Sequence, residues 1–127
     1  MCALLLTGCG TTAPLPPDGL RNPRGVALAC IEGGKATPLA SCASDKNVRA
    51  FVTGGGIGSV SIARPIDNLW VDTDKSVLGF TPLMVGDLPR AIIADPDDPT
   101  WLYMTLALGN ELVRMDAAAP SLATLTR

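Results

Sequence analysis

Histidine is absent from this sequence of 127 residues, and aromatic and charged residues are scarce, at 4% and 17% of the chain. Without histidine, the chain lacks the commonest general base and the commonest metal ligand, so no cofactor or metal is expected. A net charge of −2 provides no basic surface for phosphate backbones, which argues against a nucleic-acid partner. Beyond the N-terminus, no apolar run approaches the roughly 20 residues of a membrane-spanning helix.

Turn-forming residues are abundant, with 13 glycines and 11 prolines, and they separate short aliphatic segments. This pattern predicts an all-β domain of antiparallel strands. The continuous apolar runs are typical of strands buried on both faces, although periodicity alone does not distinguish them from short buried helices. The predicted strands are Val26–Cys30, Val48–Thr53, Ser59–Ala63, Phe80–Val85, Ala91–Ala94, Trp101–Leu106 and Glu111–Met115.

The chain also resembles itself. The stretch Pro-Arg-Gly-Val-Ala from residue 23 is matched 66 residues later by Pro-Arg-Ala-Ile-Ile from residue 89. Phe-Val-Thr from residue 51 is matched 52 residues later by Tyr-Met-Thr from residue 103. Each unit is therefore predicted to contain three strands, the third ending near Arg64 or Asp116, and the first unit has 14 extra residues between its first two strands. Short antiparallel strands repeated at this length are typical of propeller blades.

The segment AFVTGGGIGSVSI, residues 50–62, resembles the YVTN-type β-propeller repeat. In that repeat an aromatic-Val-Thr-Asn strand is followed by a glycine turn and a Val-Ser-Val strand. Residues 68–74, 79–83 and 85–89 are similar to inter-blade segments of large propeller lipoproteins from bacteria with outer membranes. The resemblance covers residues 22–116 and implies a propeller fold.

Three residues depart from the repeat. Gly54 and Leu106 stand where it has Asn, and Arg64 stands where Asp is usual. The two units are therefore expected to be degenerate blades, spanning residues 22–86 and 87–127, with a fourth strand predicted at 121–126. Because a propeller closes with about four to eight blades, the chain is expected to be the front part of a longer protein.

The N-terminus contains Leu6-Thr7-Gly8-Cys9, which resembles the lipobox of bacterial lipoproteins. The resemblance implies that Cys9 is the lipid attachment site, that the protein contacts a membrane through this anchor, and that it lies in the cell envelope, with the outer membrane favoured. Residues 1–9, including Cys2, are interpreted as a truncated signal segment, since no basic residue precedes the apolar run. Residues 10–21 have the Pro/Thr-rich composition of a tether. A buried N-terminal strand with a core cysteine is the alternative.

Cys30 and Cys42 flank the 14-residue insertion of the first unit, with eleven residues between them. Neighbouring strands of a blade would bring these cysteines within bridging distance, and an exported protein occupies an oxidising compartment. A disulfide is therefore expected, and a pair of buried thiols is the alternative. A metal site is not expected, because no CxxC spacing is present.

Other motifs are weaker. Asp72–Ser76 places oxygen ligands at alternate positions, as a calcium loop does, but lacks its turn glycine and distal glutamate. Asp95–Pro99 is expected to be a turn. Gly54–Gly58 is glycine-rich but lacks the Lys-Ser/Thr of a phosphate-binding loop. Trp70 and Trp101 are interpreted as blade-packing residues.

Two classes of function follow. The favoured one is a non-catalytic propeller lipoprotein that acts as a binding or scaffold module for an unidentified protein or small molecule. The alternative is the N-terminal part of a propeller enzyme, similar to a lactonase or a quinone-dependent dehydrogenase, with its active site in further blades. No catalytic residue is assigned in this segment.

Overall fold

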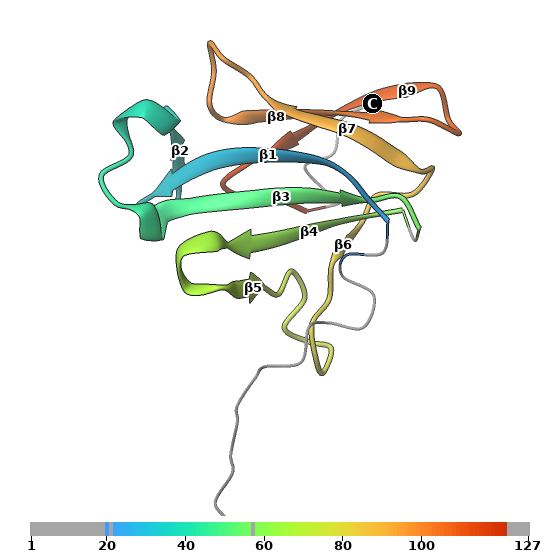
Figure 1. Cartoon of the computed structure of the whole chain (residues 1–127), viewed down its shortest axis with the longest axis horizontal. Helices are drawn as coiled ribbons and strands as arrows, with labels where there is room; N and C mark the ends of the chain where they lie inside the picture. The colour runs from blue at the N-terminus through green and yellow to red at the C-terminus, as the bar shows by residue number, and fades with distance from the viewer. Residues whose placement is uncertain (1–19, 21, 57, 122–127) are drawn as a thin grey trace, which may run out of the picture.

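The computed structural model describes residues 20, 22–56 and 58–121. In this part the chain is all-β, and its strands pair antiparallel in two sheets (Figure 1). The first sheet consists of β1 (Pro23–Glu32), β2 (Lys35–Thr37), β3 (Val48–Gly54), β4 (Ser59–Arg64), β5 (Leu69–Val71) and β6 (Leu83–Met84). The second consists of β7 (Pro89–Ala94), β8 (Trp101–Leu106) and β9 (Glu111–Asp116). The described helices are the 3-10 turns η1 (Leu39–Ser41), η2 (Asp45–Asn47) and η3 (Pro65–Asp67).

The strand order of the first sheet is β2-β1-β3-β4-β5, with β6 also paired to β4, and that of the second is β7-β8-β9. The predicted signal segment with Cys2 and Cys9, the tether except for Leu20, and the predicted strand at 121–126 except for Ser121 lie outside the described residues.

The predicted strands are confirmed except for Phe80–Val85, of which only Leu83 and Met84 pair, as β6. Pro82 has no amide hydrogen to donate, and Gly86 has a positive φ of 80°, so the ladder is interrupted on both sides. The three-residue strands β2 and β5 were not predicted. Strands this short carry no periodic pattern by which a sequence could reveal them.

The prediction that the strands are buried on both faces is confirmed for β4 and wrong for β8. All four residues from Ser59 to Ile62 in β4 are buried. In β8, the side chains of Leu102, Met104 and Leu106 are buried, whereas Thr105 is exposed. The second sheet therefore contacts the core with one face and leaves the other face uncovered.

The sequence repeat is a repeat of strand pairing. Every residue pair within β7–β9, except Trp101 with Asp116, has a counterpart within β1, β3 and β4 at the spacings of 66 and 52 residues. Matching trios of paired residues are Val26, Val52 and Ser61 in the first sheet and Ile92, Met104 and Val113 in the second. A shift of one residue in either unit would move each side chain to the opposite face, so this agreement in register makes the two units structurally equivalent.

The irregular parts of the two units also agree. A bulge lies between Pro23 and Gly25 in β1 and between Pro89 and Ile92 in β7. The turns that follow β3 and β8 end on Gly58 with φ of 67° and on Asn110 with φ of 50°. These positions are 52 residues apart, and glycine and asparagine are the residues that adopt this left-handed conformation at least cost.

The two sheets lie one over the other, with β1 and β7 running side by side in the same direction (Figure 1). Gly25 near the start of β1 lies against Arg90 and Ile92, and Ala29 near its end shares a groove with Ala94. We call the two core-facing surfaces the inner faces. The first inner face contains Ala27, Phe51, Thr53, Val60 and Ile62, and the second contains Ile92, Leu102, Met104, Val113 and Met115.

The inner faces are not equivalent faces of the repeat. At the repeat spacings, inner-face Ile92 corresponds to Val26, which lies on the opposite, outer face of the first sheet. Inner-face Phe51 corresponds to Tyr103, which lies on the outer face of the second sheet. The units therefore pack front to back, as successive members of a series do.

A threonine joins the two sheets. The Thr53 hydroxyl accepts a hydrogen bond from the Gly25 amide at 2.8 Å. It can donate to the Arg90 carbonyl of the second sheet, 3.1 Å away, or to the Gly25 carbonyl at 3.3 Å. The corresponding Thr105 accepts a hydrogen bond from the Ala91 amide at 3.2 Å, but it is exposed.

We predict that Thr53→Val lowers the free energy of unfolding by about 1–3 kcal/mol, because it leaves buried polar groups without a partner. Thr105→Val is the matched control and should change it by less than about 0.5 kcal/mol, since water can replace the hydroxyl at an exposed site. Urea denaturation of dilute protein measures both values. Equal effects of the two substitutions would contradict this account of the contact between the sheets.

Candidate functional site

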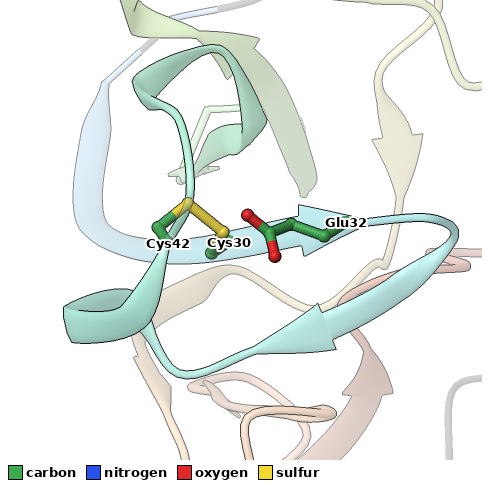
Figure 2. Close-up of side chains that lie close together, drawn as sticks. All are labelled: Cys30, Glu32 and Cys42. Atoms are coloured by element: carbon green, nitrogen blue, oxygen red, sulfur yellow. A yellow bond between two sulfur atoms is a disulfide. The ribbon is translucent and has the colours of Figure 1, made fainter.

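The insertion in the first unit forms a bridged loop at the end of β1. Its chain turns back at Gly33 and Gly34, both with positive φ, pairs as β2 along β1, and returns through η1 and η2 to β3. Cys30 and Cys42 form a disulfide with their Cα atoms 5.8 Å apart (Figure 2). The predicted pairing is thus present, and it fastens the insertion to a buried residue of the sheet.

Glu32 organises the same loop. Its Oε1 atom accepts a hydrogen bond from the Ala43 amide at 2.6 Å and another from the Asn47 side chain at 3.1 Å. The carboxylate lies beside the disulfide (Figure 2). Nothing in the sequence pattern pointed to this role, because residue 32 meets its partners only through the fold.

Cys30, Glu32 and Cys42 bring their ligand atoms within 4.8 Å of one another, which is close enough to hold a metal ion. Both sulfur atoms are used by the disulfide, however, and thiolates are the form in which cysteine binds metals. Glu32 already accepts two hydrogen bonds. In the bridged protein these three residues therefore hold the insertion in place.

A groove of about 320 Å³ lies between the insertion and the β7–β8 turn. It is lined by Ala29, Pro38, Leu39, Ala40, Ala94, Asp95, Pro96, Asp97 and Pro99. The wall is mainly aliphatic and proline-rich. Such a surface can contact a partner, but it offers few groups for chemistry.

The acidic cluster Asp95–Pro99 is a turn, as predicted. The Asp95 carboxylate accepts hydrogen bonds from the amides of Asp97 at 2.9 Å and Asp98 at 3.2 Å. Hydrogen bonds from Thr100 hold the pKa of Asp98 below its ordinary value, so this carboxylate stays ionised to lower pH. Its stabilising contribution is present above the unfolded pKa and is lost as the pH falls through the folded one.

The loop Asp72–Ser76 uses its oxygens in the same way. The Asp72 carboxylate accepts from the amides of Asp74 at 3.2 Å and Thr81 at 3.1 Å. Hydrogen bonds from Ser76 lower the pKa of Asp74. These oxygens shape the turn, so the loop is explained without a calcium ion.

The remaining motifs take structural positions. The Gly58 carbonyl accepts hydrogen bonds from the amides of Val85 at 2.8 Å and Gly86 at 2.9 Å, so the glycine-rich turn helps to hold β6. Trp70 packs edge-on against Phe80 with the ring centroids 5.5 Å apart. The Arg114 guanidinium lies 4.2 Å from the Trp101 ring centroid. Trp101 thus belongs to the outer side of the second sheet, with Arg114.

Comparison of the chain with protein-family models, with curated proteins and with solved structures found no match. The resemblance to the propeller repeat therefore rests on the residues that carry it. Within the described residues, no helix is long and apolar enough to span a membrane.

We predict that replacing both Cys30 and Cys42 with alanine lowers the free energy of unfolding by about 2–3 kcal/mol, because the bridge no longer restricts the unfolded chain. Urea denaturation with and without a thiol reductant measures the effect. The reductant should destabilise the native chain by a similar amount and leave the double variant unchanged. A native chain that is insensitive to complete reduction would contradict a structural role for the bridge.

Proposed function

We propose that the chain is part of an antiparallel β-propeller lipoprotein, held at the outer membrane through Cys9, where it acts as a non-catalytic binding or scaffold module. The observation that carries this proposal is the repeat: two units of identical register, packed front to back. Front-to-back packing leaves Ile93 and Leu112 of the second sheet exposed, whereas the equivalent Ala27 and Val60 of the first sheet are buried. Propellers resolve this by closing a ring of about four to eight such units.

The disulfide supports export. Structural disulfides form and persist in oxidising compartments and are rare in the reducing cytosol. The Cys30–Cys42 bridge fastens a surface loop, which suits a protein made for the cell envelope. The lipobox-like Leu6-Thr7-Gly8-Cys9 supplies the means of anchoring, because an acylated cysteine would hold the domain at a membrane surface.

A binding role is supported by the hydrogen bonds that the acidic side chains accept. The carboxylates of Glu32, Asp72 and Asp95 accept backbone hydrogen bonds within their own loops. The groove beside the insertion is lined mainly by aliphatic residues and prolines. This arrangement suits contact with a partner better than proton transfer, which needs a titratable group free to exchange its proton.

We predict that the protein, produced in its bacterial host from its natural gene with a C-terminal epitope tag, partitions with membranes and carries acyl chains on Cys9. Cys9→Ser should release it from membranes or block its processing. Cys2→Ser is the matched control and should behave as the parent does, since residue 2 lies in the proposed signal segment. Membrane fractionation and mass spectrometry of the N-terminal peptide provide the measurement.

A Cys9→Ser variant that is still processed and membrane-bound, with no added mass on native Cys9, would contradict the lipoprotein assignment. The pairing of the described strands and the disulfide would stand, because they do not depend on the anchor.

A further inference from the structure

The residues around the disulfide include a set of donor atoms that suits zinc. Thiolate sulfur and carboxylate oxygen both bind Zn²⁺ in proteins. The sulfur atoms of Cys30 and Cys42 and a carboxylate oxygen of Glu32 lie within 4.8 Å of one another. Cys30 and Glu32 are two residues apart on β1, so their side chains project from the same face of the sheet, where Cys42 meets them (Figure 2). While the two sulfur atoms are bonded to each other, this set does not hold a metal ion.

The backbone positions of the two cysteines also suit a metal ion. Zinc–sulfur bonds are about 2.3 Å long, so two thiolates on a tetrahedral zinc ion lie about 3.8 Å apart. The Cα atoms of Cys30 and Cys42 are 5.8 Å apart. Rotation about each Cα–Cβ bond can bring the two sulfur atoms to the zinc separation and leave the strands in place. Cys42 and Glu32 are only partly buried, so an ion has access from the solvent side.

Glu32 is already oriented for such a role. The hydrogen bonds from the Ala43 amide at 2.6 Å and from the Asn47 side chain at 3.1 Å are both accepted by Oε1. The Oε2 atom is therefore left for a metal ion. Hydrogen bonds of this kind fix the orientation of ligands in metal sites. Because Ala43 follows Cys42 in the chain, the first of them also holds the carboxylate beside that cysteine.

A buried hydroxyl beside Cys30 supplies a second observation. Thr37 of β2 pairs directly with Cys30 of β1, so the two side chains lie on the same face of the sheet. The Thr37 Oγ1 atom is buried and makes no hydrogen bond with the residues that the structure describes. An unpaired buried hydroxyl is unfavourable, and a Cys30 thiolate would accept its hydrogen bond. The hydroxyl therefore points to a second state, in which the sulfur of Cys30 is negatively charged.

We infer that the reduced chain binds one Zn²⁺ ion through the thiolates of Cys30 and Cys42 and the carboxylate of Glu32, with water in the fourth position. The Thr37 hydroxyl donates a hydrogen bond to the Cys30 thiolate. The metal ion and the disulfide exclude each other, because they use the same two sulfur atoms. The site belongs to the chain before its disulfide forms, and the metal ion then holds the insertion as the bridge does later. The inference does not rest on the proposed function.

Exchange between the two states balances chemically. Reduction by a dithiol breaks the bond between Cys30 and Cys42 and gives each sulfur a proton, while the dithiol becomes a disulfide. Zn²⁺ then displaces the two thiol protons, which pass to the solvent. In the other direction, oxidised glutathione takes two electrons from the zinc-bound thiolates. The bridge forms, two glutathione thiolates leave and Zn²⁺ is released.

The test is calorimetric titration with Zn²⁺ of the full chain with Cys2 and Cys9 changed to serine, so that no other thiol competes. The chain is reduced with a dithiol, which is then removed in the absence of air. The reduced chain should bind one Zn²⁺, and the bridged chain should not bind it at that affinity.

Glu32→Gln and Thr37→Val should each raise the dissociation constant at least about tenfold, since one removes a ligand and the other removes the partner of a ligand. Asp97→Asn is the matched control. It removes the same charge as Glu32→Gln from an exposed carboxylate in the β7–β8 turn and should bind as the parent does. Circular dichroism shows whether each reduced variant is folded.

Two further measurements connect the metal ion with the fold and with the bridge. Zn²⁺ should raise the urea midpoint of the reduced chain and leave that of the bridged chain unchanged, because a ligand stabilises only the form that binds it. Oxidised glutathione should release one Zn²⁺ for each bridge formed. A chromogenic chelator measures the released metal, and mass spectrometry measures the bridge.

A folded, reduced parent that binds no Zn²⁺ would overturn the proposal, and so would an unfolded one that Zn²⁺ does not refold. A Glu32→Gln or Thr37→Val variant that binds as tightly as the parent would also overturn it, because two thiols alone would then account for the binding. Zn²⁺ that stays bound after the bridge has formed would do the same. None of these outcomes bears on acylation of Cys9, so failure here is distinguishable from failure of the proposed function.

Discussion

The two sheets approach each other closely at β1 and β7 because residue 25 has no side chain. An ideal Cβ atom on Gly25 would lie 2.9 Å from the Arg90 carbonyl oxygen and 3.1 Å from the Ile92 nitrogen, and both neighbours are backbone atoms that cannot rotate away. The Thr53 hydroxyl joins the Gly25 amide to the Arg90 carbonyl at the same point. The buried apolar side chains of both sheets pack around this contact. The spacing of the core therefore depends on a glycine, and its alignment depends on a threonine.

The contact joins opposite faces of two equivalent units, and this asymmetry governs the rest of the molecule. Had the units packed through the same face, a twofold relation would have satisfied both and the structure would be closed. Front-to-back packing instead leaves Val26 exposed at one end and Ile93 at the other. A heterologous contact of this kind ends only when a ring closes or a different partner covers the last face. The propeller proposal derives from this one property.

Much of this arrangement was predictable from the sequence. The match of Pro23 with Pro89 and of Thr53 with Thr105 gave the two offsets, and the observed register follows them. The turns at Gly58 and Asn110 were also predictable, because glycine and asparagine are the residue types that most readily adopt a positive φ. A spacing of eleven residues between cysteines, in a chain expected to be exported, was enough to suggest the disulfide.

Other features depend on contacts between residues distant in sequence. The sequence has no signal for the role of Glu32, whose partners Ala43 and Asn47 reach it only after the insertion folds back. The close approach at Gly25 could not be foreseen either, since the repeat has alanine at the matching position. The one-sided burial of β8 was missed because Trp101 and Tyr103 on its outer side are themselves largely apolar, so the strand looks suited to burial on both faces, and only the position of the neighbouring sheet decides between them.

The most direct test of this account compares Gly25→Val with Ala91→Val by urea denaturation at concentrations where the chain is monomeric. Strand preference alone predicts that valine stabilises both positions, because glycine weakens a strand interior and alanine is a poor strand former. Close packing of the sheets predicts that Gly25→Val lowers the free energy of unfolding by about 1–3 kcal/mol, as overpacking does, and that Ala91→Val leaves it unchanged or slightly raised. A Gly25→Val protein as stable as the parent, or more stable, would contradict the packing of β1 on β7 from which the rest of the account follows.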